Sequence, residues 1–140
     1  MQPGEQQELV RGIAGRLVEI APTGWARLVG NWEATVQGPE VNLNYITLAV
    51  VGQGRGWAAG QIGFDEPLYD LVVELNEAMA RSGERWTVMD LEIDGDGRFR
   101  TAFGYDTPKR SNGIYDEESM GRFENYLATW VAEHGATSAG

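Results

Sequence analysis

The stretch Trp86–Tyr105, WTVMDLEIDGDGRFRTAFGY, decides the fold, because two segments of alternating apolar and polar residues flank a cluster of glycine and aspartate. This pattern is typical of a β-hairpin. A two-residue loop would set the apolar side chains of one strand against the charged side chains of the other. A three-residue loop over residues 95–97 instead pairs Ile93 with Phe99 and keeps apolar residues on one face. We predict this register, with Gly97 in the left-handed conformation.

The same register arranges the charged face of the hairpin. It places Glu92 opposite Arg100 and, at the mouth of the hairpin, Asp94 opposite Arg98. Opposite charges that face each other across neighbouring strands stabilise the pairing. We therefore expect one face of the hairpin to be core and the other to be solvated and ion-paired.

The rest of the chain predicts three helices and three more strands. Apolar residues recur at helical spacing in 5–21, in the segment that Asp65 can cap and that ends near Ser82, and after Asp116 or Ser119. Strand patterns occupy 25–36, 41–51 and 57–64, and the polar connection 106–113 is expected to be exposed and mobile. The order α-β-β-β-α-β-β-α predicts an α+β fold, an antiparallel sheet of about five strands with helices packed mainly on one face.

Length and composition indicate one domain over residues 1–140, with frayed ends at about 1–4 and 135–140. A chain of 140 residues that is 42% hydrophobic can form one stable hydrophobic core but is too short for two domains with a core each. It contains no apolar run long enough to span a bilayer, no secretory signal pattern and no cysteine. We expect a cytoplasmic protein stabilised by packing rather than by disulfides.

The net charge of -10 is concentrated in the second half of the chain. Residues 1–64 hold five acidic and four basic residues, whereas residues 65–140 hold sixteen acidic and seven basic ones. The negative electrostatic potential of such a surface disfavours binding to nucleic acid or to an anionic membrane and favours encounter with a basic protein. An acidic surface can also have no role other than to keep the protein in solution. The composition therefore leaves open whether the acidic residues bind a partner or only confer solubility.

Two glycine-containing loops resemble ligand sites and fail on spacing. Residues 92–97 place carboxylates at the first, third and fifth positions of a calcium-loop pattern, but the twelfth position is Phe103 instead of glutamate. Residues 52–56, GQGRG, lack the GK[ST] ending and the helix that a phosphate-binding loop needs. We expect an acidic hairpin turn and a flexible loop, with no metal or cofactor.

The sequence contains few side chains that could act in catalysis. The single histidine, His134, falls at a helix end where a cation is favoured, and no cysteine or second histidine can join it. The acids Asp116, Glu117 and Glu118 could form a carboxylate cluster, but acids at a helix start are what the helix dipole prefers. We expect that the protein is not an enzyme.

Three local patterns and the order of elements resemble the YezG-like immunity (antitoxin) proteins of bacterial polymorphic toxin systems. The patterns are an N-terminal amphipathic helix that runs into IAPTGW at 20–25, an acidic helix before Arg85-Trp86-Thr87, and a hairpin with the motif G-x-F-x-x-x-F-x-Y-D over Gly97–Asp106. The resemblance covers nearly the whole chain. It implies a small non-catalytic protein that binds and neutralises a cognate toxin, often a nuclease.

Together with the acidic half, the resemblance suggests a partner surface with an aromatic hot spot. The candidate partner-binding residues are Asp94, Asp96, Asp106, Tyr115, Asp116, Glu117 and Glu118. The alternative is a chaperone-like adaptor or peptide-binding module without a toxin partner. A hydrolase that relies on carboxylates would require two of them close together in a pocket with a bound metal.

Overall fold

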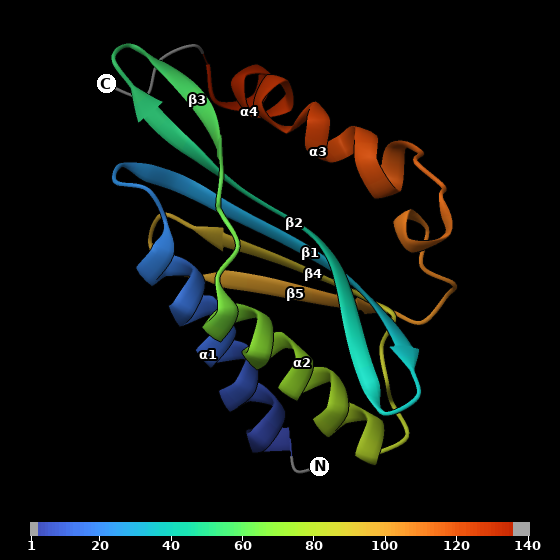
Figure 1. Cartoon of the computed structure of the whole chain (residues 1–140). Coiled ribbons are helices and arrows are strands. Elements are labelled where there is room, and N and C mark those ends of the chain that lie inside the picture. Colours follow the sequence, from blue (N-terminus) through green and yellow to red (C-terminus); the bar gives the residue numbers. More distant parts are fainter. Residues whose placement is uncertain (1–2, 136–140) are drawn as a thin grey trace.

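The computed structural model describes residues 3–135 and forms one antiparallel sheet with helices on both faces (Figure 1). The α+β fold predicted from the sequence is confirmed. From one edge to the other the strands are β3 (Gly56–Gln61), β2 (Glu40–Gln53), β1 (Trp25–Gln37), β4 (Val88–Asp94) and β5 (Phe99–Gly104). The fraying expected at 1–4 and 135–140 concerns residues that lie mostly outside the described range, and helix α1 already includes residues 3 and 4.

The hairpin β4–β5 has the predicted register. Ile93 lies opposite Phe99 and Glu92 opposite Arg100, and the Asp94 amide donates to the Arg98 carbonyl at 2.8 Å. Gly97 closes the loop at a φ of 91°, which a residue with a β-carbon adopts only at a cost. The alternation of residue types within this one segment was sufficient to determine its pairing.

Helices α1 (Pro3–Ile20) and α2 (Glu66–Arg81) cover one face of the sheet and enclose the main core. Asp65 caps α2 as predicted, accepting from the Leu68 amide at 3.0 Å. Arg16 of α1 donates to both oxygens of the Asp65 carboxylate at 2.8 Å each, and thereby joins the two helices. The largest side chains of this core are fully buried: Trp32, Trp86, Ile13, Leu17, Leu28, Leu75, Met79, Met89, Leu91 and Ile93.

The opposite face is covered in part by the C-terminal helices. A π-helical turn, η2 (Glu117–Gly121), leads into α3 (Arg122–Glu124) and α4 (Tyr126–His134), which lie across from α1 and α2 (Figure 1). Trp57 of β3 packs edge-on against Trp130 of α4 at 5.2 Å between ring centres. This second, smaller core consists of Val29, Leu48, Val50, Phe123 and Trp130.

The connection between β5 and η2 differs from the prediction. We expected it to be exposed, but Pro108 and Arg110 are buried, and Arg110 begins a short 3-10 turn, η1 (Arg110–Asn112). The prediction was wrong for these two residues, because Arg110 has polar partners on the sheet beneath, whereas Asp106, Thr107 and residues 111–113 are exposed as expected. Among residues 3–135, no helix combines the length and the apolar character that crossing a bilayer requires.

Candidate functional site

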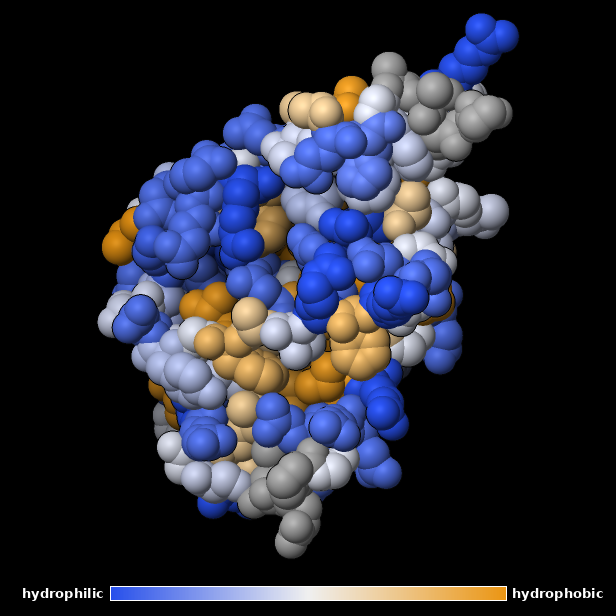
Figure 2. Space-filling model, turned by 180° about the vertical axis from the view of Figure 1, so that it is seen from behind, coloured by the Kyte–Doolittle hydropathy of each residue, from blue (hydrophilic) through white to orange (hydrophobic). Residues whose placement is uncertain are grey.

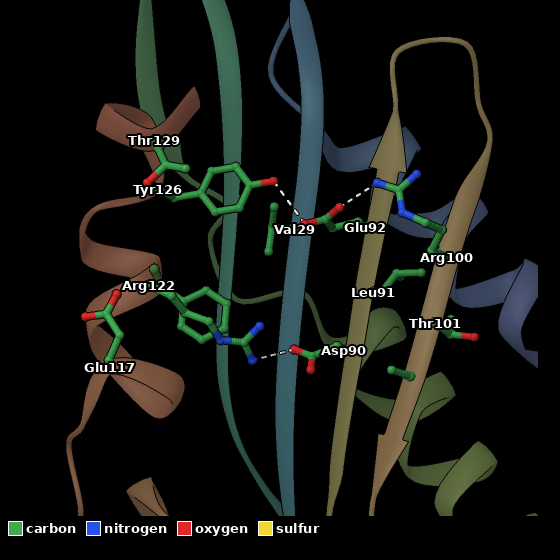
Figure 3. Close-up of a pocket in the computed structure, with 12 residues that line it drawn as sticks. Val29, Asp90, Leu91, Glu92, Arg100, Thr101, Glu117, Arg122, Tyr126 and Thr129 are labelled. Carbon is green, nitrogen blue, oxygen red and sulfur yellow. Dashed lines mark hydrogen bonds and ion pairs between the residues drawn. The ribbon is translucent and has the colours of Figure 1, made fainter. Parts of the chain in front are cut away.

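A groove of about 480 Å³ lies on the outer face of β4 and β5, next to the C-terminal helices (Figure 3). Asp90 and Glu92 project from β4 toward the helices, because residues of even number on this strand face away from the main core. Arg122 and Tyr126 reach them from α3 and α4, and Arg100 reaches Glu92 from β5. The groove is therefore walled by the sheet on one side and by helices on the other.

The charged side chains of the groove are paired with one another. The Asp90 carboxylate accepts from Arg122 at 2.9 Å and from Asn31 at 2.6 Å. The Glu92 carboxylate accepts from Arg100 at 2.5 Å and from the hydroxyl of Tyr126 at 3.2 Å. These carboxylates therefore serve as counter-ions for their own chain.

Tyr126 joins the groove to strand β1. Its hydroxyl accepts from Arg27 at 2.9 Å, and Arg27 also pairs with Glu92 and with Asp94. Burial raises the pKa of Tyr126, so the phenol stays protonated and keeps donating to Glu92. Hydrogen bonding from Arg100 lowers the pKa of Asp94, which therefore stays ionised.

A second polar cluster, buried except for Asn44, lies beneath the connection. Arg110 is buried, and its guanidinium donates to Asn44 Oδ1 at 2.8 Å, to Asn31 Oδ1 at 2.7 Å and to the Ser119 carbonyl at 2.9 Å. Glu33 is also buried and lies 3.6 Å from the guanidinium. Burial lowers the pKa of Arg110, but guanidinium groups keep their charge in proteins. We call Asn31, Glu33, Asn44 and Arg110 the Arg110 cluster.

The Arg110 cluster fixes the backbone of the connection to the sheet. The Glu33 carboxylate accepts from the backbone amide of Arg110 at 3.0 Å and from that of Ser111 at 2.8 Å. It also accepts from the Ser111 hydroxyl at 3.1 Å. One carboxylate on strand β1 thus satisfies two loop amides and balances one buried cation, which holds the loop in a single place.

The segment held in this way, residues 105–118, displays large apolar side chains to solvent. Tyr115 is 66% exposed, Tyr105 56% and Ile114 49%. Isolated exposed apolar residues are ordinary, but three within fourteen residues on a pinned segment are a candidate contact surface. We call residues 105–118 the display segment.

The display segment also carries four of the predicted acidic residues. Asp106, Asp116, Glu117 and Glu118 are exposed, against one lysine, Lys109, which pairs with Asp116 at 2.8 Å and with Glu118 at 3.1 Å. The hydrogen bond from Lys109 and the capping bonds from Ser119 lower the pKa of Asp116 to about 2. The segment is therefore negatively charged at neutral pH.

The predicted site residues divide between two places. Asp106, Tyr115, Asp116, Glu117 and Glu118 belong to the display segment, where Asp116 also caps η2 in the way that the sequence suggested. Asp94 and Asp96 lie at the other end of the hairpin, and the six residues of β5, roughly 20 Å of strand, separate them from Asp106. Asp94 is paired with Arg27 and Arg100, and Asp96 with Arg98.

Residues 3–135 contain no group of three side chains suited to hold a metal ion. The carboxylates of the calcium-like pattern are spread along a strand and a turn, with Glu92 and Asp94 held by arginines. His134 stacks on Trp130 at 3.7 Å between ring centres, and its Nδ1 lies 3.1 Å from the Trp130 carbonyl. The histidine therefore packs on α4 and lies against a carbonyl of its last turn.

Sequence reasoning missed the Arg110 cluster. Asn31 and Glu33 occupy the polar parity of β1, which reads as a solvated face when the strand is considered alone. The signal that could have revealed them is the apolar helix at the C-terminus, a third predicted helix that needs its own face of the sheet. A covered second face requires that polar residues on it find partners.

No family model and no curated protein matches this chain.

Proposed function

We propose that this protein binds a basic protein partner through the display segment and so neutralises it, as an immunity protein does for a toxin domain. The observation that carries the proposal is the placement of three exposed apolar side chains among four carboxylates on one pinned segment. Interfaces draw most of their binding energy from a few aromatic anchors, while charges around them speed association.

The pinning of the segment by the Arg110 cluster favours this role. A loop that must be ordered on binding loses affinity to the entropy of ordering, whereas a loop already held in place does not. Glu33 holds two backbone amides of the display segment, at 3.0 Å and 2.8 Å, in the unbound chain. The display segment is thus pre-organised for contact.

The charge of the chain favours a basic partner. The chain carries a net charge of -10, and the display segment exposes four of its carboxylates, with Lys109 beside them and Arg110 buried against Glu33. Nucleases and other enzymes that act on nucleic acid present basic surfaces, and such a surface is attracted to this one over distances of about 8 Å at physiological salt. A nuclease toxin is accordingly the partner class that we propose.

The test co-expresses this chain with the product of the neighbouring gene, where a cognate toxin is expected, and captures the complex by pull-down. We expect association, rescue of growth, and a loss of affinity of about 30-fold or more for Tyr115→Ala, the value for an aromatic hot spot. The charge reversal Asp106→Lys with Glu117→Lys should slow association about tenfold or more at low salt. Neither residue caps a helix, so the fold should be unaffected.

The matched control is Asp96→Lys, compared with the single reversal Asp106→Lys, because each changes the charge by +2 at an exposed position, Asp96 at the tip of the hairpin. It should leave affinity nearly unchanged, because the tip lies at the far end of β5. Absence of association and of rescue would reject the toxin proposal. Equal effects of the tip and display-segment variants would reject the display segment as the contact surface.

The groove of about 480 Å³ supports the alternative, an adaptor that holds an extended peptide. The two functions are separated by Ala102→Trp, which fills the groove from exposed strand β5 without altering the display segment. An adaptor should lose its partner with this substitution and keep it with Tyr115→Ala. A display-segment binder should respond in the opposite way.

A further inference from the structure

Strand β5 is an edge of the sheet, with one side of its backbone open. Within residues 3–135 it pairs only with β4, and the hydrogen bond from the Asp94 amide to the Arg98 carbonyl identifies that pair as a hydrogen-bonded one. Hydrogen-bonded pairs alternate along an antiparallel ladder, so Arg100 and Ala102 also bond to β4. The amides and carbonyls of Phe99, Thr101 and Phe103 therefore point to the open edge.

Apolar surface borders this edge. Seen from behind, apolar side chains gather in the middle of the molecule over β5 and the neighbouring helix α1, within a largely hydrophilic surround (Figure 2). Phe99 is 36% exposed and Thr101 is exposed. Together with Val10 and Arg11 of α1 they border a hollow of about 280 Å³ beside the strand.

The edge is nearly neutral, although the chain is strongly acidic. Arg98 pairs with Asp96 at 3.3 Å, and Arg100 pairs with Glu92 at 2.5 Å and with Asp94 at 3.0 Å. The charges along β5 are thus balanced within the chain. Two copies, each with a net charge of -10, would repel least where they approach through this strand.

We propose that β5 pairs with β5 of a second copy around a two-fold axis at Thr101, which joins the two sheets into one of ten strands. The sequence of the strand suits this arrangement, because FRTAF read in reverse is FATRF. Phe99 then faces Phe103 of the second copy, Thr101 faces Thr101, and Arg100 faces Ala102. Aromatic residues meet aromatic residues, and no arginine faces an arginine.

The backbone selects the same register. With the axis at Thr101, the open amides and carbonyls of residues 99, 101 and 103 meet those of 103, 101 and 99 in the second copy. A shift by one residue would set open groups against groups already bonded to β4 and would place Arg100 on the side of Phe103. An unrelated partner strand would need this same pattern of aromatic and small residues, which β5 itself supplies.

The test uses Thr101→Cys, since the chain has no cysteine. Facing residues of a hydrogen-bonded pair have Cα atoms about 5.5 Å apart, within the range of about 4.4–6.8 Å that a disulfide requires. We expect the unaltered chain to have twice the mass of a monomer by light scattering. Mild oxidation of Thr101→Cys should then form a disulfide between the two copies. This disulfide should form faster than one between surface cysteines that do not face each other.

Arg100→Cys is the matched control. Its equivalent in the second copy lies two residues further along the strand, about 8 Å away and too far for a disulfide. Thr101→Pro removes an amide that faces the open edge while leaving the β4 ladder intact, so it should yield a folded monomer. Circular dichroism of that variant checks its fold.

Three results would overturn the proposal. One is a monomeric chain at its highest soluble concentration, with Thr101→Cys linking no faster than Arg100→Cys. The second is a dimer that links through Arg100→Cys instead, which would place the axis elsewhere. The third is a folded Thr101→Pro chain that remains dimeric, which would show that the copies meet through another surface.

Discussion

Two arginine–carboxylate clusters lie on the outer face of the same sheet, and they differ mainly in their access to water. At the mouth of the hairpin, Arg100 pairs with Glu92 and Asp94, and its side chain is 55% exposed. Beneath the display segment, Arg110 lies against Glu33, and both side chains are 3% exposed. The chemistry is the same, but the cost of losing one partner differs.

The difference follows from solvation. An exposed ion pair that is broken regains water on both sides, so it contributes about 0–1 kcal/mol. A buried pair that is broken leaves a charge without water and without a partner, which costs about 3–5 kcal/mol. The ion pairs of Arg100 add little to the pairing of β4 with β5, which the apolar residues already determine. The Arg110 cluster, by contrast, determines where the display segment lies.

The largest effect is predicted for Glu33→Ala. It should lower the free energy of unfolding by about 3 kcal/mol, the lower end of the range for a broken buried pair, because Asn31, Asn44 and the Ser119 carbonyl still accept from Arg110. Urea unfolding followed by tryptophan fluorescence measures the loss. The freed connection should also become sensitive to trypsin after Lys109 and Arg110.

A double-mutant cycle with Arg110→Ala sharpens this result. The two substitutions together should cost about 1–3 kcal/mol less than the sum of each alone, because the second removes a charge that the first has left unpaired. Additive costs would show that Glu33 acts only through the loop amides. A trypsin-resistant Glu33→Ala chain would show that other contacts hold the display segment.

A smaller effect is predicted for Arg100→Ala. It should lower the free energy of unfolding by less than about 1 kcal/mol, because Glu92 and Asp94 remain accessible to water and keep Arg27 as a partner. The same urea titration measures it, and 1 M salt should reduce the difference further. A loss as large as that of Glu33→Ala would show that exposure does not distinguish the two clusters.

The two clusters also differ in how far the sequence predicts them. Glu92 and Arg100 are eight residues apart, and alternation within one hairpin placed them opposite each other. Arg110 and Asn31 are 79 residues apart, and nothing local to either indicates that a C-terminal helix will bring them together. Sequence reasoning therefore succeeded where pairing depends on a short loop and failed where it depends on the packing of a second face.

The candidate site follows the same rule. Tyr115 and Asp116 were predicted as contact residues from their type, and they lie together because they are adjacent in the chain. Asp96 was grouped with them on charge alone, and the length of β5 separates it from them. The exposed apolar side chains of Tyr105 and Ile114 were not singled out, because their exposure depends on how the Arg110 cluster orients the segment.

The smallest effect is predicted for the pH dependence of Asp116, an exposed residue that flanks the buried cluster. Its pKa is lowered from 3.8 to about 2 by Lys109 and by the Ser119 cap. Its contribution to stability is therefore fully present above about pH 4 and is lost as pH falls toward 2. Asp116→Asn should be less stable than the unaltered chain at pH 5. The urea midpoints of the two chains should converge as the pH falls to about 2. Glu118→Gln, which shares Lys109 but caps nothing, is the control and should change the midpoints less. A difference for Asp116→Asn that persists unchanged at pH 2 would mean that the cap, and not the charge, is what Asp116 supplies beside the Arg110 cluster.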